Sequence, residues 1–291
     1  MSNHPSPFTL EVPDPTLADL AQRLSRTRWP DEPPLAPWTS GTSLDYMKEL
    51  AAYWQRGFDW RVHEVALNAL HQFTVPLSGI EQLHFIHEPG VGPDPMPLLL
   101  AHGWPGSILE FMAVIPLLTD PGRHGGHPAD AFTVVAPSLP GYTLSYTAGQ
   151  RRFGVEEIAQ TFHALMTEVL GYERYGAQGG DWGSFVASLL ALRWPDKVIG
   201  IQLNMLPLRL DARARATPSE EERQFADAAR RWVREETGYQ AIQGTKPQTL
   251  AFGLNDSPVG LAAWIVEKFR TWTDCQGEPE NAVPRDQMLA N

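Results

Sequence analysis

GAQGGDWGS, residues 176–184, places an aspartate between two glycines in the pattern G-x-D-x-G. Gly179 precedes Asp181 by two positions, and Gly183 follows it by two. At a sharp turn between a strand and a helix, this frame presents a nucleophile, usually a serine. The glycines are needed because the central residue is strained and larger neighbours would collide with the strand and the helix. The stretch therefore predicts a carboxylate held at the tip of a tight turn.

The segments on both sides of this turn fit the prediction. Tyr175–Ala177 leads into the glycines as a strand, and Asp181–Arg193 is apolar and helical. The start of a helix favours an anion, so we expect Asp181 to be ionised. A carboxylate attacks a tetrahedral carbon and forms an ester that must then be hydrolysed. The alternative is that Asp181 only caps the helix that begins at Trp182, but the strand–turn–helix context favours a nucleophile.

A second motif, AHGWPGS at 101–107, directly follows the apolar run PLLLA. A His-Gly pair after an early strand supplies one backbone donor of an oxyanion hole in hydrolases. Here that donor is the N–H of Trp104, and the second is the N–H of Trp182. Both are expected to stabilise the oxyanion formed when an ester of Asp181 is hydrolysed. The alternative, an ordinary Gly-Pro turn, is disfavoured by the aspartate turn further along the chain.

Strands and helices alternate through residues 96–207. The apolar runs at 97–101, 132–136 and 198–203 predict strands, the first covered on both faces. The segment 155–170 is an amphipathic helix. Strands that alternate with helices indicate a parallel sheet with right-handed crossovers. We therefore assign this region to the core of an α/β fold.

Residues 1–95 precede the core and form mostly short helices. These are expected to begin near Asp14, Ser43 and Asp59, each at the start of an apolar periodic segment. A pair of strands follows around 73–88. The region is rich in tryptophan, which predicts an arm that packs over another part of the chain.

Residues 208–291 follow the core and are again helical. Thr217 and Glu220 form a predicted capping box, and Gly238 is expected to close the helix that it starts. Ser257 is expected to open another apolar helix.

Composition excludes several classes of partner. The chain has 291 residues, 43% of them hydrophobic, and a net charge of −11, which argues against nucleic acid or an anionic membrane as partner. Its single cysteine, Cys275, favours a reducing cytoplasm. We recognise no signal peptide, membrane span, metal-ligand cluster or phosphate-binding glycine loop. We therefore expect no metal and no cofactor, and the oligomeric state stays open.

Four stretches together resemble the microsomal-type epoxide hydrolases, which include the juvenile-hormone epoxide hydrolases. They are HGWPGS (102–107), PSLPGY (137–142), GGDWGS (179–184) and the long stretch 238–272. The resemblance spans nearly the whole chain, and the last stretch is its most specific part. It implies an α/β-hydrolase fold in which the first region is an N-terminal helical extension and the last region is a helical lid.

The resemblance also implies a two-step reaction of an epoxide with water. Asp181 opens the epoxide by backside attack, and lid tyrosines bind the epoxide oxygen and donate a proton. Tyr239 matches the first lid tyrosine by position. A histidine oriented by a carboxylate then activates water, and the product is a vicinal diol. We expect His102 and Pro105 to line the substrate pocket and the epoxide to be apolar.

The sequence departs from the family pattern after the lid. All nine histidines precede Asp181, and the chain ends with DQMLAN at 286–291. The family pattern puts the second lid tyrosine, the acid, the histidine and the last core strands further along, so we expect them beyond Asn291. The alternative is a natural short form without turnover, which the intact stretch 238–272 disfavours. The family also includes membrane-anchored members, and we recognise no anchor here. The chain alone is therefore expected to form the ester and then stall.

Three other functions compete with this interpretation. A haloalkane dehalogenase uses the same aspartate turn, also followed by tryptophan, but its leaving group needs no proton donor. A non-catalytic binding protein on the same scaffold would explain the missing histidine but not the retained nucleophile. A serine esterase is disfavoured because Ser184 lies one turn into the helix and reads as a small packing residue.

Overall fold

The structure, a computed structural model, describes residues 4–206 and 216–291. The chain forms two compact units. The first contains Met1–Val12, Asp59–Pro207 and Asp286–Asn291, and the second contains Pro13–Phe58 and Leu208–Arg285. The predicted extension, 1–95, contributes to both units, and the predicted boundary at 207/208 lies outside the described residues.

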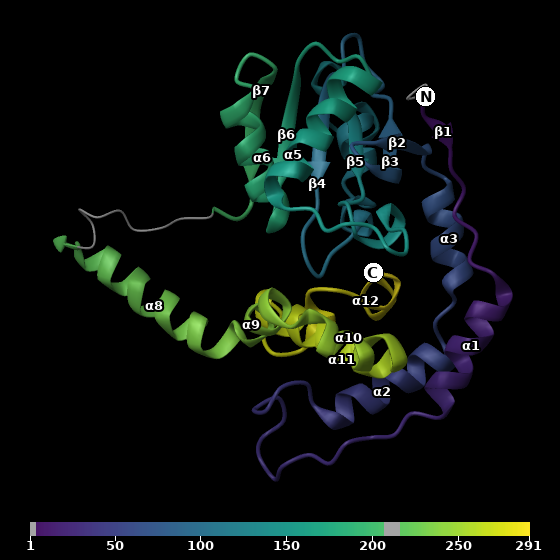
Figure 1. Cartoon of the computed structure of the whole chain (residues 1–291), viewed down its shortest axis with the longest axis vertical. Coiled ribbons are helices and arrows are strands. Elements are labelled where there is room, and N and C mark those ends of the chain that lie inside the picture. Colours follow the sequence, from purple (N-terminus) through teal and green to yellow (C-terminus); the bar gives the residue numbers. More distant parts are fainter. Residues whose placement is uncertain (1–3, 207–215) are drawn as a thin grey trace. The chain divides into compact units, whose positions relative to one another are not determined.

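The first unit is built on one mixed sheet of seven strands (Figure 1). Its strands are β1 (Ser6–Pro7), β2 (Gln72–Leu77), β3 (Ile80–Glu88), β4 (Met96–Ala101), β5 (Phe132–Pro137), β6 (Tyr175–Gly179) and β7 (Val198–Leu203). Their order is β1-β2-β3-β5-β4-β6-β7. The four strands β4 to β7 run parallel to one another. The other pairs, β1 with β2, β2 with β3 and β3 with β5, are antiparallel. The predicted parallel core and the predicted strand pair before it are both confirmed.

Strand β4 is covered on both faces, as its apolar run predicts. Leu99 belongs to a buried cluster shared with α5 and α6, and Leu100 belongs to a second cluster on the opposite face. The helices of this unit are α3 (Trp60–Asn68), α4 (Ile115–Thr119), α5 (Val155–Ala164), α6 (Trp182–Arg193) and α12 (Arg285–Ala290), with single-turn segments η1 (Ile108–Phe111), η2 (Pro121–His124), η3 (Pro128–Asp130) and η4 (Thr143–Ser145). The predicted helix 155–170 is α-helical in its first part and continues as a π-helical turn, η5 (Leu165–Val169).

In its described part the second unit contains helices and connecting loops but no strand. It contains α1 (Asp14–Ser25), α2 (Leu44–Arg56), α8 (Glu220–Glu236), α9 (Gly238–Thr245), α10 (Pro247–Asp256), α11 (Pro258–Trp272) and the short η6 (Pro279–Asn281). Ser43 and Ser257 cap α2 and α11 as predicted, each accepting a backbone N–H hydrogen bond. The Thr42 hydroxyl donates to the carbonyl of Ala263 at 2.7 Å, which joins the N-terminal arm to α11.

Two predicted helix ends in the lid are wrong. The capping box consists of Ser219 and Glu222, not Thr217 and Glu220. Both pairs fit the spacing, but a cap at Ser219 puts three consecutive glutamates into the first turn of α8, where the helix dipole favours negative charge. Gly238 starts α9 rather than closing α8, because good helix-forming residues resume directly after it.

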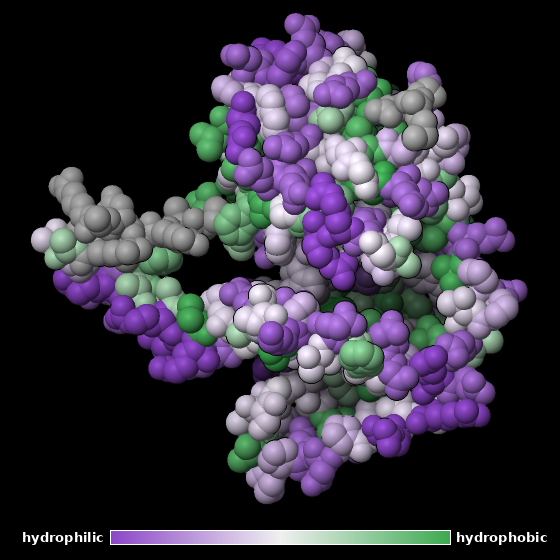
Figure 2. Space-filling view, in the orientation of Figure 1, coloured by the Kyte–Doolittle hydropathy of each residue, from purple (hydrophilic) through white to green (hydrophobic). Residues whose placement is uncertain are grey.

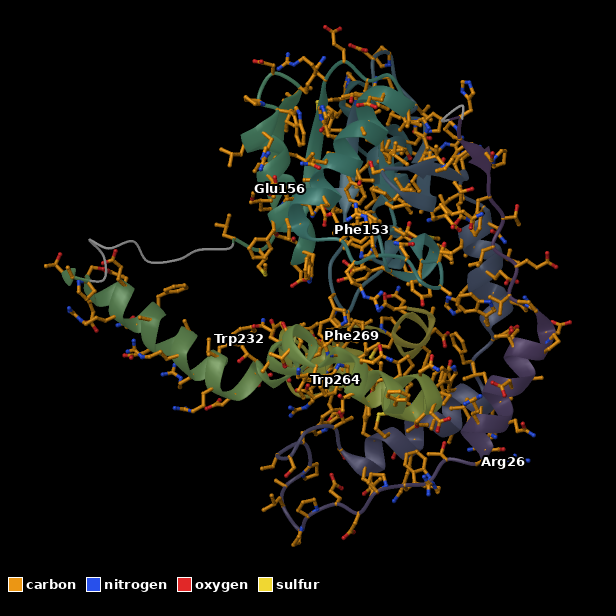
Figure 3. All side chains as sticks on the ribbon, viewed as in Figure 1. Arg26, Phe153, Glu156, Trp232, Trp264 and Phe269 are labelled. Atoms are coloured by element: carbon orange, nitrogen blue, oxygen red, sulfur yellow. The ribbon has the colours of Figure 1, made fainter. Side chains whose placement is uncertain are left out.

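The apolar side chains of α8 lie on an exposed surface. Phe225, Trp232 and Val233 are 47%, 42% and 57% exposed, and none of the described residues of α8 is buried. Figure 2 shows hydrophobic residues among the hydrophilic ones on this helix, and Figure 3 labels Trp232 on it. These apolar side chains form the pattern of a helix that covers an apolar surface.

Candidate active site

Asp181 sits on a strained backbone between β6 and α6. Its φ of 49° and ψ of −120° are rare for a residue that is not glycine. The side chain makes no capping hydrogen bond with α6, although the residue occupies the N-cap position. Instead, Asp181 Oδ1 accepts a hydrogen bond of 2.8 Å from the backbone N–H of Trp104. The carboxylate is therefore held toward the loop after β4, and helix capping does not explain it.

The two glycines that flank Asp181 make this geometry possible. A methyl group at Gly179 would lie 2.0 Å from the carbonyl oxygen of Gly183, and one at Gly183 would lie 1.9 Å from that of Ala101. Both partners are backbone atoms, so no side-chain rearrangement can relieve the overlap. The G-x-D-x-G spacing thus lets the turn pack against the end of β4.

We expect Gly179→Ala to lower the free energy of unfolding by about 1–3 kcal/mol, because an extra methyl group forces the backbone apart. Gly200→Ala is the matched control: it lies in the neighbouring strand β7, and its added methyl group meets nothing within 4 Å. Urea denaturation of both variants measures the difference. Equal stability of the two variants would show that the turn tolerates a side chain.

The loop after β4 is anchored by His102. This residue is only 1% exposed. Its Nε2 accepts from the backbone N–H of Leu139 at 3.0 Å, and its Nδ1 lies 3.1 Å from the carbonyl of Gly103. Burial lowers the pKa of His102 to about 4, so the ring is neutral at pH 7. His102 therefore has structural hydrogen bonds, and its place in the substrate pocket stays a prediction.

The neutral state of His102 predicts a loss of stability in mild acid. Its folded pKa of about 4 lies below its ordinary value of 6.5, so the unfolded chain takes up the proton first as the pH falls. The free energy of unfolding then decreases from about pH 6.5 toward pH 4, by at most about 1.4 kcal/mol per pH unit. In His102→Gln, the contribution of this side chain to the pH dependence of the free energy of unfolding is expected to disappear. Urea denaturation at several pH values checks it, and equal slopes in both chains would contradict it.

Pro105 follows a cis peptide bond after Trp104. Its carbonyl accepts a hydrogen bond of 2.7 Å from the Asn291 side chain, whose Oδ1 in turn accepts from the Ser107 hydroxyl at 3.0 Å. Trp182 is 36% exposed. The roles of Pro105 in the pocket and of the Trp182 N–H in the oxyanion hole both stay predictions. Ser184 is fully buried, and its hydroxyl donates to the carbonyl of Gly179 at 3.1 Å, which fits the packing role expected for it.

Two titratable neighbours of Asp181 were not predicted. Burial and then the charge of Asp181 raise the pKa of Glu110 to about 7, and the same two causes raise the pKa of Tyr142. A methyl group at Gly106 would lie 1.4 Å from Glu110 Oε1, so this glycine makes room for the carboxylate. The sequence signal was weak because Glu110 reads as an ordinary acid in a first helical turn.

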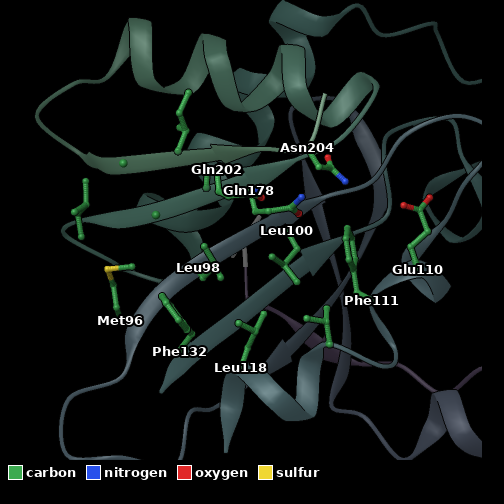
Figure 4. Close-up of a pocket in the computed structure, with 16 residues that line it drawn as sticks. Met96, Leu98, Leu100, Glu110, Phe111, Leu118, Phe132, Gln178, Gln202 and Asn204 are labelled. Carbon is green, nitrogen blue, oxygen red and sulfur yellow. The ribbon is translucent and has the colours of Figure 1, made fainter. Parts of the chain in front are cut away.

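A groove of about 640 Å³ lies on one face of the sheet in the first unit (Figure 4). Most of its lining is apolar, from residues such as Leu98, Leu100 and Phe132. Its polar members are Glu110, Gln178, Gln202 and Asn204. Gln178 Oε1 is buried there and has no hydrogen-bond partner. None of Asp181, Trp104, His102 and Pro105 lines this groove, so we do not assign the substrate to it.

Tyr239 lies on α9 in the second unit. Its hydroxyl oxygen accepts a hydrogen bond of 2.9 Å from the side-chain amide of Gln240. Its ring packs against that of Trp272 on α11, with centroids 5.2 Å apart. The structure therefore shows Tyr239 on a helix of the second unit; that this unit is a lid and that Tyr239 donates a proton both stay predictions.

Residues 4–206 and 216–291 contain no group of three or more His, Cys, Asp or Glu side chains that could hold a metal ion. None of the helices within these ranges is both long enough and apolar enough to cross a membrane.

In comparisons with known proteins, two family models match the chain. A family model described as the epoxide hydrolase N terminus matches residues 5–111, and one for the alpha/beta hydrolase fold matches 96–273. The chain is 42% identical to a putative epoxide hydrolase of Stigmatella aurantiaca over 98% of its length and 64% of that protein. It is 39% identical to epoxide hydrolase 1 of Oryctolagus cuniculus over 93% of its length and 63% of that protein. The chain thus spans a little less than two thirds of these relatives.

Solved structures show the same fold. The epoxide hydrolase of Aspergillus niger superposes with a TM-score of 0.83 at 31% identity and covers 98% of this chain and 73% of its own. The juvenile hormone epoxide hydrolase of the silkworm Bombyx mori superposes with a TM-score of 0.80 at 31% identity, over 100% of this chain and 71% of its own. The identity, the coverage and the strained aspartate turn lead to one conclusion: the chain belongs to the epoxide hydrolase family and has an α/β-hydrolase fold.

Proposed function

We propose that this chain attacks an epoxide as an epoxide hydrolase does, with Asp181 as the nucleophile. One carboxylate oxygen forms a bond to an epoxide carbon, and the bond from that carbon to the epoxide oxygen breaks. The released oxygen takes a proton from the phenol of Tyr239. The products of this step are an ester of Asp181 that carries a neighbouring hydroxyl group and the phenolate of Tyr239, which is reprotonated from solvent.

The observation that carries the proposal is the hydrogen bond from the Trp104 N–H to Asp181 Oδ1, at 2.8 Å. This bond fixes the orientation of the carboxylate and leaves the attack to Oδ2. After attack, Oδ1 becomes the carbonyl oxygen of the ester and still faces the same donor. When water adds to the ester, negative charge develops on Oδ1, where a preorganised N–H stabilises it. One donor therefore supports both steps.

Tyr239 suits the role of proton donor. A neutral phenol donates a hydrogen bond strongly enough to assist the departure of an alkoxide. The Gln240 amide occupies a lone pair of the phenol oxygen and not its proton. A donated hydrogen bond also favours negative charge on that oxygen as the proton leaves. The preference for an epoxide over an alkyl halide rests on this residue, because a departing halide needs no proton.

Mapping of the covalent adduct tests the nucleophile. The chain is incubated with an isotope-labelled apolar epoxide, digested and sequenced by mass spectrometry, and the label is expected on Asp181. A label on any other side chain would overturn the proposal. A parallel incubation with an alkyl halide, followed for halide release, tests the dehalogenase alternative: faster reaction with the halide than with the epoxide would favour that function.

A further inference from the structure

A buried lysine lies beside the proposed proton donor. Lys268 on α11 is only 7% exposed. Its ammonium nitrogen is 5.1 Å from the ring centroid of Tyr239 and 5.5 Å from that of Trp272. Lysine is almost never buried to this extent unless its charge is paired. The two rings and the ammonium group thus form a compact cluster on α9 and α11, which we call the Lys268 cluster.

Two carboxylates surround the Lys268 cluster. Glu267 Oε2 forms an ion pair with the Lys268 ammonium, and Glu267 Oε1 accepts from the Thr271 hydroxyl at 3.1 Å. Glu236, the last residue of α8, has a raised pKa because of burial and then the charge of Glu267, and the charge of Lys268 opposes this rise. The Lys268 ammonium group therefore interacts electrostatically with two carboxylates, Glu267 and Glu236, and with the two aromatic rings of the cluster.

We propose that Lys268 is a positioning residue for Tyr239: its ammonium group holds the phenol ring and favours negative charge on the phenol oxygen during proton donation. A cation within about 6 Å of an aromatic ring is attracted to its face, and more strongly when both groups are desolvated. The attraction grows when the ring becomes a phenolate, because the charges are then opposite. The inference rests on the proposed role of Tyr239 as proton donor.

The charge of Glu267 opposes this effect, which makes the inference testable in both directions. Lys268→Met keeps the length of the side chain and removes the cation. Glu267→Gln keeps the shape of its side chain and removes the opposing anion. If the ammonium group acts on the phenol through its charge, these variants shift the ionisation of Tyr239 in opposite directions. Lys268→Arg keeps the charge and is expected to behave like the unchanged chain.

The experiment follows the ionisation of Tyr239 by NMR of the whole chain with carbon-13 at the ζ position of its seven tyrosines. Comparison with Tyr239→Phe assigns the resonance. In Lys268→Met, the pH at which half of the phenol is ionised is expected to rise by about one unit, since one unit corresponds to about 1.4 kcal/mol. In Glu267→Gln this pH is expected to fall. An unchanged midpoint in a folded Lys268→Met chain overturns the inference.

If Lys268→Met does not fold, the Glu267→Gln variant still decides: an unchanged or raised midpoint overturns the inference. The rate of ester formation from an epoxide gives a second readout, and it is expected to fall about tenfold in Lys268→Met, in line with a one-unit change in the acid. The NMR titration needs no substrate. A chain that does not react with epoxides would therefore overturn the proposed function and leave the result on Lys268 readable.

Discussion

Incubation of the 291-residue chain with an apolar epoxide is expected to add the mass of one epoxide molecule per chain and then to stop. In the proposed mechanism the Asp181 carboxylate attacks the epoxide, but hydrolysis of the resulting ester requires a base that activates water. All nine histidines precede Asp181. His84 and His102 are buried, and both ring nitrogens of each have hydrogen-bonding partners, so neither is placed to act as that base. Intact-mass spectrometry measures the adduct, and chromatography measures the diol.

Two substitutions make the expectation specific. Asp181→Asn and Asp181→Ala are expected to abolish the mass increase, because neither side chain is a carboxylate nucleophile. Asp196→Asn is the matched control, since Asp196 is an exposed residue between α6 and β7 in the same unit. It is expected to react as fully as the unchanged chain. Diol in excess of one molecule per chain would show that a base for the second step is present among these residues.

Tyr239→Phe is expected to slow ester formation from an epoxide by about 100-fold or more, the usual contribution of a positioned general acid. Removal of the phenol hydroxyl removes the proposed proton donor of the departing oxygen and leaves the ring that packs against Trp272. The rate is measured by stopping the reaction at intervals and quantifying the adduct by mass.

Reaction with an alkyl halide provides the internal comparison for Tyr239. A departing halide takes no proton, so the rate of alkylation is expected to be the same with and without the hydroxyl. Tyr146→Phe is the matched control variant, because Tyr146 is 53% exposed and lies in the first unit. Equal loss of rate toward both reagents would assign Tyr239 a role in packing or binding and remove it from proton transfer.

The strands and the aspartate turn could be predicted because their signals are local. The apolar run before residue 102 predicts a strand covered on both faces. The glycines around Asp181 indicate a steric requirement, and the structure explains it: a methyl group added at Gly179 would lie 2.0 Å from the carbonyl oxygen of Gly183. The sequence predicted the Trp104 N–H as an oxyanion donor, but it could not show that this N–H also binds the free carboxylate of Asp181, because that contact depends on how two loops meet at the edge of the sheet. Lys268 gave no signal either, since a lysine on a helix is usually solvated.

Helix ends in the lid were the least predictable feature. Overlapping T-x-x-E and S-x-x-E patterns at 217–222 offered two caps, and only the placement of the glutamates relative to the helix dipole separates them.

Glu110 could not be predicted as part of the site. Its pKa is raised by burial and by the charge of Asp181, which is distant in sequence.

The chain passes between its two units four times, at 12/13, 58/59, 207/208 and 285/286. No single cut can therefore release either unit as one intact fragment. Asp181 and the Trp104 N–H that orients its carboxylate both belong to the first unit, whereas Tyr239 belongs to the second. The backbone atoms that crowd Gly179 and Gly183 all belong to the first unit, so the steric demands of the aspartate turn fall on that unit alone. Substitutions among the helices of the second unit leave those demands unchanged.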